Sequence, residues 1–417
     1  MHVAIVGGGL CGLALAIALK KRSISFTIYE ARSSFTELGA GINLGPNTLE
    51  TFRLIDPTLS EDVLKLCTKN PPPKEHILMT VRLGCPTDSF EDAQVVAELN
   101  APPTGNATVR RNELIQLLTD TAGSEHARLD KKVVNLTETA QQVELSFSDN
   151  STARADLVVA CDGIHSNTRQ KMVGAMDPAA RARYSNAGGY RAVVSMSDLE
   201  AAVGAEIART SNLFVGPGAY IIMYPVEFGA KVNIGFWVYK YGPWKEPGWV
   251  LSSQRHEFES DFAEWGETVH NIMKLVGDPP FWAGFHHAHQ PASIRRGRIC
   301  LIGDAAHSMP PHQGAGSGQA MEDAFVLADV LGAVNQSSGL DAALEAYEAV
   351  RTPRSQRVLE TSVEAMDFWS KFHRRDLGEK DVRRFAKDAQ ERFRWIWEDD
   401  IAGQARRARE LMEAAMQ

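Results

Sequence analysis

The chain opens with an apolar, an amphipathic and a second apolar segment, which together predict a β-strand, an α-helix and another β-strand. Residues 2–7 are short, β-branched and ended by glycines, as buried parallel strands are. Residues 13–21 carry apolar positions at helical spacing and end in lysines, which the helix dipole favours. Residues 25–30 repeat the strand pattern. A compact βαβ unit is therefore expected at the N-terminus.

Similar elements return later in the chain, separated by a segment of another kind. Residues 111–122 read as a helix, 143–147 alternate like a strand, and 155–160 and 298–303 read as buried strands. After about residue 180 the pattern changes to longer alternating strands. Their positions are 190–196, 219–226 and 231–239, and a short turn at 227–230 joins the last two into an antiparallel hairpin.

The last quarter of the chain is helical and charged. A long helix follows the small-residue loop after residue 303, and further helices are expected over 342–372 and 380–416. The aromatic and arginine cluster at 392–397 is interpreted as helix packing or as a dimer contact.

This order predicts a Rossmann-like α/β domain that a mostly antiparallel β-sheet domain interrupts. The expected ranges are 1–180 and 286–360 for the α/β domain, 181–285 for the β-rich domain and 361–417 for a C-terminal helical segment.

Composition narrows the class of protein. The 417 residues are 44% hydrophobic and 23% charged, as in a globular protein, and the net charge of −8 disfavours a nucleic-acid-binding protein. The five cysteines form no CxxC pair, which argues against a disulfide framework or a cysteine-rich metal site. No segment resembles a signal peptide or a membrane span, so a cytoplasmic protein without a membrane partner is expected.

The histidines at 286, 287 and 289 are interpreted as structural rather than as metal ligands. Neighbouring side chains on a strand point to opposite faces, and no carboxylate or thiol lies at ligand spacing. No metal site is therefore expected.

The first chemical motif is a glycine-rich turn between the first strand and the first helix. In the pattern Gly-x-Gly-x-x-Gly, the glycines allow a tight turn, close approach of a pyrophosphate and close helix–strand packing. Glu30 ends the second strand, where a carboxylate accepts from ribose hydroxyls. The expected dinucleotide-binding residues are Gly7, Gly9, Leu10, Cys11, Gly12 and Glu30.

A second motif separates FAD from NAD. Residues 302–324 (IGDAAHSMPPHQGAGSGQAMEDA) form a strand, a Gly-Asp turn, a loop of small residues and a helix. Asp304 at the strand end can accept from a polyol hydroxyl. Gly314, Ala315, Gly316 and Ser317 can form a nest of N–H groups that stabilises an anionic flavin edge.

Here the chain resembles the class A flavoprotein aromatic hydroxylases, in particular salicylate-hydroxylase-like monooxygenases and fungal phenol hydroxylases. Residues 161–169 (CDGIHSNTR) resemble the family's DG motif, which implies that Asp162 serves FAD and NAD(P)H. Arg111 matches the arginine of the family's His-Arg-x-x-Leu segment that contacts FAD, although Arg110 replaces the histidine. Residues 37–43 resemble a flavin-side loop, which adds Gly41, Ile42 and Asn43.

The resemblance also implies substrate-binding residues. Arg191 matches an arginine over the substrate and can hold a carboxylate or phenolate. Tyr224 matches the tyrosine of a His-x-x-x-Tyr-Pro strand, in which Tyr220 replaces the histidine. His312 matches a position that meets the substrate and can act as a base or hydrogen-bond partner. Trp237 and Pro311 are further candidates for the pocket wall, and for the two tyrosines core packing remains the alternative.

The implied reaction is hydroxylation of a salicylate-like or polyketide-derived phenol by FAD, NADPH or NADH, and molecular oxygen. It would pass through a flavin C4a-hydroperoxide, with or without decarboxylation. Hydroxylative dearomatisation, epoxidation and a non-hydroxylating flavin oxidoreductase remain open, as does the choice between a monomer and a homodimer.

Overall fold

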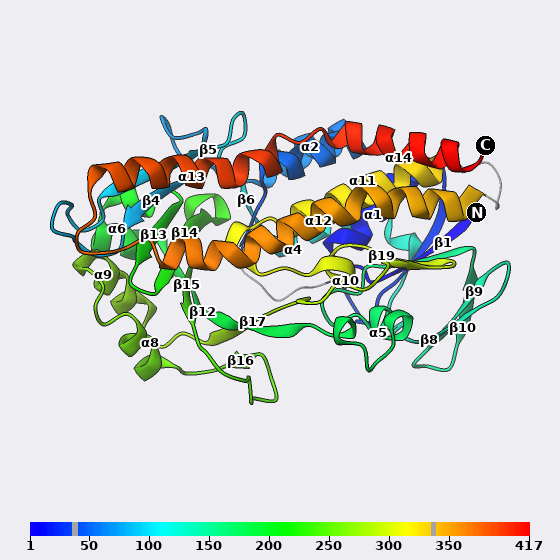
Figure 1. The fold of residues 1–417 in the computed structure, drawn as a ribbon, viewed down its shortest axis with the longest axis horizontal. Helices are drawn as coiled ribbons and strands as arrows, with labels where there is room; N and C mark the ends of the chain where they lie inside the picture. Colours follow the sequence, from blue (N-terminus) through cyan, green and yellow to red (C-terminus); the bar gives the residue numbers. More distant parts are fainter. Residues whose placement is uncertain (36–40, 335–338) are drawn as a thin grey trace.

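The structure, a computed structural model, describes residues 1–35, 41–334 and 339–417. Its elements form two parts that follow one another along the long axis of the molecule (Figure 1). One part is built on a six-stranded sheet and the other on an eight-stranded sheet. Both termini lie at the six-stranded end (Figure 1).

The six-stranded sheet has the order β18-β19-β11-β1-β2-β7, and among its pairs only β18 with β19 is antiparallel. Its strands are β1 (His2–Val6), β2 (Ser25–Tyr29), β7 (Ala127–Arg128), β11 (Leu157–Ala160), β18 (Arg295–Arg296) and β19 (Ile299–Leu301). The predicted βαβ unit is confirmed, with β1 and β2 parallel on either side of α1 (Leu10–Lys21). Because β1, β11 and β19 are neighbours, the motifs that follow their carboxyl ends meet at one edge of the sheet.

The eight-stranded sheet has the order β16-β17-β12-β15-β14-β13-β4-β5. Its strands are β4 (Ile77–Leu83), β5 (Val95–Asn100), β12 (Arg183–Ser195), β13 (Asn212–Gly216), β14 (Ala219–Val226), β15 (Lys231–Tyr239), β16 (Val250–Leu251) and β17 (Phe281–His286). All pairs are antiparallel except β13 with β4, and the predicted hairpin of β14 and β15 is present. The mixed fold with an inserted antiparallel sheet agrees with the predicted fold class.

Two strands of this sheet, β4 and β5, lie outside the range 181–285 expected for the β-rich domain. β4 and β5 come from a segment whose sequence reads as mixed loop. All seven residues of β4 are buried, including Thr80 and Arg82, so its sequence lacks the alternation that marks a half-exposed strand. The β-rich part therefore draws on residues 77–100 as well.

Two small sheets complete the strands of the described residues. A two-stranded sheet joins β3 (Gly41–Asn43) to β6 (Thr108–Arg110), and a three-stranded sheet holds β8 (Val133–Glu138), β9 (Val143–Phe147) and β10 (Thr152–Ala155). Short 3-10 turns occur at Ser124–His126, Pro178–Ala180, Glu227–Gly229 and Pro311–Gln313.

Helices cover both sheets and join the two parts. The remaining helices are α2 (Pro46–Ile55), α3 (Pro57–Leu66), α4 (Arg111–Ala122), α5 (Asn167–Val173), α6 (Met196–Val203), α7 (Ala205–Ala208), α8 (Arg255–Asp261), α9 (Glu267–Val276), α10 (Asp304–His307), α11 (Gly316–Gly332), α12 (Leu340–Ser370), α13 (Glu379–Trp397) and α14 (Ile401–Ala415). α12 extends from the six-stranded to the eight-stranded part (Figure 1). It contacts α11 and α14 as well as β13 and β14, so it ties the parts together.

The segment expected as one helix over 380–416 is two helices. α13 ends at Trp397, and α14 begins after Asp400, whose carboxylate accepts from the backbone N–H of Gly403. An aspartate at this position satisfies an otherwise unpaired helix N–H group and starts a new helix.

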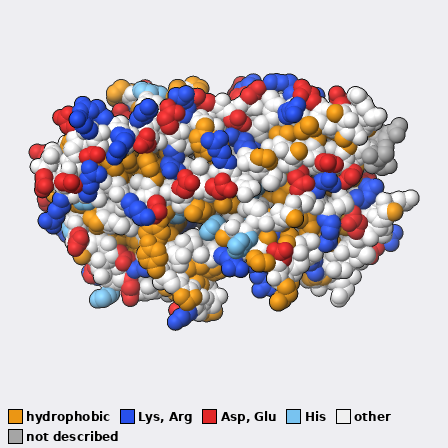
Figure 2. Space-filling model, viewed as in Figure 1, with side chains coloured by type: hydrophobic (Ala, Val, Ile, Leu, Met, Phe, Trp, Pro, Cys, Tyr) orange, Lys and Arg blue, Asp and Glu red, His pale blue; other side chains and the backbone are white. Residues whose placement is uncertain are grey.

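The eight-stranded sheet is buried on both faces. Phe236 packs on one face with Phe258 of α8, and Leu213 packs on the other with Trp369 of α12 and Phe393 of α13. On the outer surface in Figure 2, acidic and basic side chains are interspersed. Among the described residues, no helix is both long and apolar enough to cross a membrane.

Candidate active site

The glycine turn after β1 leaves space that a side chain would fill. Gly7 has φ +103°, and a Cβ there would lie 2.5 Å from the carbonyl oxygen of Cys161. A Cβ on Gly12 would lie 2.0 Å from the carbonyl oxygen of Gly7, so only glycine lets α1 begin this close to β1. The amino end of α1 thus opens on the carboxyl edge of the sheet, where its free N–H groups suit a diphosphate.

Glu30 is held beside this turn. Its carboxylate accepts from the backbone N–H of Gly8 at 2.7 Å and from that of Arg32 at 2.8 Å. The two hydrogen bonds hold the carboxylate next to the expected diphosphate position, where its remaining lone pairs can accept from a ribose.

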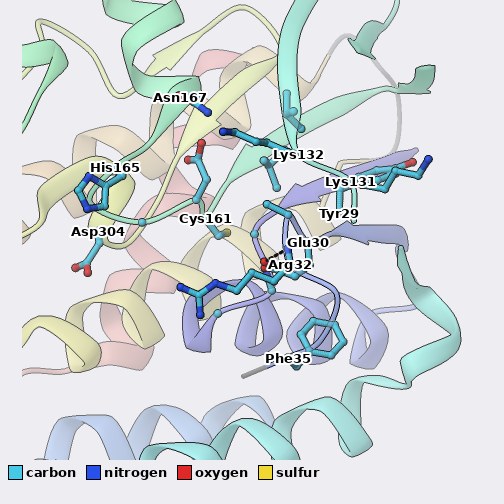
Figure 3. A pocket seen from close by; sticks show the side chains of 18 of the residues that line it. Tyr29, Glu30, Arg32, Phe35, Lys131, Lys132, Cys161, His165, Asn167 and Asp304 are labelled. Carbon is cyan, nitrogen blue, oxygen red and sulfur yellow. Dashed lines mark hydrogen bonds between the residues drawn. The ribbon is translucent and has the colours of Figure 1, made fainter. Parts of the chain in front are cut away.

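A cavity of about 590 Å³ runs along this edge of the sheet. Figure 3 shows Glu30, Asp304 and His165 among the side chains around it. Six of the expected cofactor residues line it, namely Gly7, Gly9, Glu30, Arg111, Asp162 and Asp304. Leu10, Cys11 and Gly12 do not line it, because they lie buried in the first turn of α1.

The Asp162–Gly163 turn at one side of this cavity is rigid. The Asp162 carboxylate accepts from the Ser166 hydroxyl at 2.5 Å and from the Thr168 N–H at 3.1 Å. Burial raises the pKa of Asp162, and these hydrogen bonds oppose the shift. Asp162 therefore shapes the turn that lines this side of the cavity.

Arg169 fastens this turn to the second motif, a role that the sequence did not reveal. The buried guanidinium donates to four backbone carbonyls, those of Ala179, His289, Ala305 and Ala306. The last two belong to α10, so one side chain sets the spacing between residues 161–169 and the Asp304 turn.

Asp304 and Arg111 both line the cavity, and the charge of each affects the pKa of the other. Solvent reaches the Asp304 side chain through the cavity, yet the enclosing protein raises its pKa, while His307 and Arg111 oppose the rise. Burial lowers the pKa of Arg111; Asp304 opposes that shift and Arg191 adds to it. Arg191 of the β-rich part is therefore an electrostatic neighbour of the cofactor residues.

A buried ionic network fixes the Gly303–Asp304 turn from behind. Asp323 on α11 accepts from the Gly303 N–H at 2.9 Å, contacts His307 Nε2 at 2.6 Å and pairs with Arg351 at 2.8 Å. Burial alone would raise the pKa of Asp323, but His307 and Arg351 outweigh it and lower the pKa.

The neighbouring Glu322 extends this network to α2. It pairs with Arg351 and Arg354, each at 2.6 Å, and accepts from Asn47 at 2.8 Å. The sequence placed Glu322 and Asp323 inside the second motif without giving them a task. Two adjacent acidic residues in a largely apolar helix could have indicated a buried ionic network, because buried charges need partners.

The loop before α11 adopts the geometry expected of an anion-binding turn. Gly314 has the left-handed φ of +61°, and Gly316 and Ser317 form the first turn of α11, whose N–H groups lack helical partners. Gly41, Ile42 and Asn43 of the expected flavin-side loop form strand β3, which pairs with β6. Residues 37–40 of the expected flavin-side loop lie outside the described residues.

A second, smaller cavity of about 70 Å³ lies where this loop meets the eight-stranded sheet. It brings together seven of the expected residues, namely Asn43, Tyr220, Trp237, Pro311, His312, Gly314 and Ala315. Aromatic and aliphatic side chains make up most of its remaining wall, a composition that suits an aromatic ring.

His312 and Tyr220 form a hydrogen-bonded pair in this cavity. The Tyr220 hydroxyl lies 2.7 Å from His312 Nδ1, and Trp237 stacks on Tyr220 and meets His312 edge-on. Burial lowers the pKa of His312 to about 3 and raises that of Tyr220 well above its ordinary value. The pair is therefore neutral at neutral pH.

Arg191 and Tyr224 lie near this pair but do not line the cavity. The Arg191 guanidinium is 5.3 Å from the ring centre of Trp237 and 5.5 Å from that of Trp282, a cation–π arrangement. The Tyr224 hydroxyl donates to the Gly41 carbonyl at 2.9 Å. Burial raises the pKa of Tyr224 to about 12, and Arg191 opposes the rise.

The sequence missed two further groups at these cavities. Lys131 and Lys132 line the larger cavity beside Glu30, and Phe393, Ile396 and Trp397 of α13 line the smaller one. The cluster at 392–397 does pack between helices, as Phe393 stacks on Trp369 of α12, and three of its six residues also face the candidate site. In the part of the chain that the structure describes, no cluster of three or more His, Cys, Asp or Glu is placed to hold a metal ion.

The geometry fits FAD. The glycine turn that a Cβ would fill suits its diphosphate, and the carboxylates of Glu30 and Asp304 on the cavity wall suit its ribose and polyol. The first turn of α11, with N–H groups that lack helical partners, suits the edge of its ring. The chain combines this FAD site with an aromatic-lined cavity, as a flavoprotein that acts on an aromatic ring requires.

Comparison with known proteins agrees with this class. A family model described as FAD binding domain matches residues 1–362. The 6-methylsalicylate 1-monooxygenase of Aspergillus terreus (strain NIH 2624 / FGSC A1156) is 33% identical over 98% of this chain and 91% of its own length. The salicylate hydroxylase of Pseudomonas putida is 30% identical over 96% of this chain and 93% of its own length.

Solved structures give the same result. A salicylate hydroxylase substrate complex superposes with a TM-score of 0.86 at 30% identity, over 98% of both chains. The chain belongs to the FAD-binding-domain family and is an FAD-dependent monooxygenase of the aromatic hydroxylase class. The expected family, the enzyme class and the FAD cofactor are thereby confirmed, whereas the roles of single residues remain predictions.

Proposed function

We propose that this enzyme hydroxylates a phenolic ring, taking electrons from NADPH or NADH and one oxygen atom from dioxygen. The observation that carries the proposal is the neutral His312–Tyr220 pair in an aromatic-lined cavity whose wall also contains Gly314 and Ala315 of the flavin loop. A phenol bound there would have its hydroxyl at the pair and its ring beside the flavin edge. The 6-methylsalicylate and salicylate named for the two relatives are both phenols.

Bound FAD would supply the redox chemistry, namely uptake of the electrons of NAD(P)H and activation of dioxygen. Glu30 would hold its ribose, the turn from Gly7 to Gly12 its diphosphate, and Asp304 its polyol. The N–H groups at Gly316 and Ser317 would face the pyrimidine edge of the ring.

His312 would orient the phenol by accepting a hydrogen bond from its hydroxyl. Because burial keeps the pKa of His312 near 3, the imidazole does not hold an extra proton at neutral pH. It can accept a phenol hydrogen bond at Nε2 only while Nδ1 donates to Tyr220. Accepting this hydrogen bond would draw the phenol proton toward Nε2 and make the ring more electron-rich, while His312 and Tyr220 both stay neutral.

Arg191 would stabilise the negative charge that develops on the phenol oxygen as the ring is hydroxylated. Its positive charge opposes the rise that burial causes in the pKa of both Tyr220 and Tyr224, so it acts at both phenol groups. A guanidinium beside two aromatic rings presents its five donors in one plane, so it can meet a ring oxygen directionally. Tyr224, anchored to Gly41, would position the flavin-side strand β3 while its oxygen still accepts from Arg191 or the substrate.

The test is substrate-dependent consumption of NAD(P)H by the FAD-loaded enzyme, with isotopically labelled dioxygen and product mass as the second readout. The proposal predicts that phenols accelerate consumption and that the product gains one labelled oxygen atom. If phenols accelerate consumption but only hydrogen peroxide forms across the whole panel, the enzyme is an oxidase and the proposal fails.

A further inference from the structure

Helix α13 builds part of the wall of the smaller cavity, although it lies beyond the matched residues 1–362. Phe393, Ile396 and Trp397 line the cavity from successive turns of this helix. Phe393 and Trp397 stack with their ring centres 5.0 Å apart. A Cβ on Gly45 would lie only 3.2 Å from Trp397 Nε1, so the helix closes directly on the start of α2.

Hydrogen bonds to β5 and to α12 hold α13 in this place. The Gln390 side chain exchanges two bonds with the Asn100 backbone, at 2.8 and 3.0 Å. Arg392 donates to the Thr361 carbonyl at 2.9 Å, and Arg354 donates to the Ile396 carbonyl at 2.9 Å. The aromatic wall is therefore a fixed part of the cavity.

The cavity is uncharged. None of the described residues that line it is a Lys, Arg, Asp or Glu, and its one titratable imidazole, His312, is neutral. Most of the lining side chains are apolar, namely Leu78, Met79, Leu213, Ile222, Trp237, Pro311, Phe393, Ile396 and Trp397. A carboxylate buried there would have no cationic partner and would be strongly disfavoured, whereas a hydrocarbon group would be favoured.

We propose that this cavity binds an uncharged hydrocarbon substituent of the substrate, so that the substrates are alkyl-substituted phenols. The hydroxyl would lie at His312 and Tyr220, and the alkyl group would lie between β4, β13 and α13. Any negative charge on the substrate would lie outside this cavity, toward Arg191. This inference rests on the proposed function, because it takes the phenol ring to bind at His312.

The test measures dissociation constants on the FAD-loaded enzyme from the change in flavin fluorescence, so it does not depend on turnover. The ligands are resorcinol, its methyl, propyl and pentyl derivatives, and a pentyl derivative whose chain ends in a carboxylate. The dissociation constant is expected to fall roughly fourfold per added methylene until the cavity is filled, the gain for moving a methylene out of water. The carboxylate end is expected to cancel that gain.

Two variants locate the alkyl chain. Ile396→Trp fills the cavity from α13 and is expected to remove the dependence on chain length. Leu213→Phe does the same from β13 and replaces it if the first variant fails to retain FAD. Glu391→Ala, an exposed change on the same helix, is the matched control and is expected to keep the dependence.

Equal dissociation constants across the alkyl series would overturn the inference, as would a chain-length dependence that survives both filling variants. The failure of the proposed function looks different. In that case the alkyl series still binds progressively more tightly, but no phenol in it gains an oxygen atom.

Discussion

The hydroxyl of Tyr220 lies 2.7 Å from Nδ1 of His312, and both side chains are buried against the ring of Trp237. The two residues stand 92 positions apart in the sequence and come from different parts of the fold. Their hydrogen bond fixes the imidazole and leaves Nε2 for the cavity, so the orientation of the substrate depends on a residue of the β-rich part.

Replacing Tyr220 by Phe tests this pair. The ring and its stacking on Trp237 remain, but His312 Nδ1 loses its partner, so kcat/KM for a phenol is expected to fall about tenfold to hundredfold. FAD content and the rate of FAD reduction by NAD(P)H without phenol are expected to stay unchanged. Tyr184→Phe is the matched control, because its hydroxyl bonds the Lys240 carbonyl in the same sheet. Equal kcat/KM values for Tyr220→Phe and wild type would exclude the pair from substrate activation.

Replacing Arg191 by Ala tests the stabilisation of the phenolate. Loss of a charge-assisted hydrogen bond of about 1.5–3 kcal/mol is expected to slow hydroxylation tenfold or more while FAD stays bound. A nitrophenol probe gives a readout that a purely structural role would not move. Its pKa when bound is expected to be below the solution value in the wild type and to return toward it in the variant. A bound probe with the same pKa in both proteins would contradict this role.

Replacing Asp304 by Ala tests the flavin end of the site. The variant loses the acceptor for the cofactor's polyol, so its dissociation constant for FAD is expected to rise about tenfold or more. FAD released on dilution, followed by its fluorescence, measures the change. Asp120→Ala, an exposed carboxylate on α4, serves as the control. Full retention of FAD by Asp304→Ala would rule out the assigned contact.

The buried histidines predict how stability depends on pH. Burial lowers the pKa of both His287 and His312 to about 3, so between pH 3 and 6.5 only the unfolded chain protonates them. Unfolding then takes up protons, and stability must fall as the pH drops through that window. Each histidine contributes on the order of 2 kcal/mol between pH 7 and pH 5.

Urea unfolding of wild type and His287→Leu at pH 7 and pH 5 measures this effect. The loss of unfolding free energy on going to pH 5 is expected to be smaller in the variant by the contribution of one histidine. An equal loss in both proteins would mean that His287 titrates normally in the folded state.

The cofactor half of the site could be predicted from the sequence because its signals are local. Gly7, Asp162 and Asp304 each follow a buried strand of the six-stranded sheet within three residues. Parallel strands end at one edge, so the fold brings such residues together without further information. The antiparallel insertion was equally readable, because β14 and β15 alternate and are joined by a short turn.

The substrate half could be predicted only in part, because it depends on contacts between distant segments. No periodicity joins Tyr220 to His312, or α13 to the start of α2. The Tyr224 hydroxyl, expected to face the phenol, instead donates to Gly41 in a strand whose pairing the sequence did not reveal. Arg169 appeared as the last residue of a motif, and only the folded chain shows that it holds two motifs together.

The most direct test of the account is turnover of the FAD-loaded enzyme with resorcinol and its alkyl derivatives under isotopically labelled dioxygen, with NAD(P)H supplied. The account predicts that these phenols accelerate NAD(P)H oxidation and that each product carries one labelled oxygen on its ring. Accelerated NAD(P)H oxidation with every phenol recovered unchanged would contradict it.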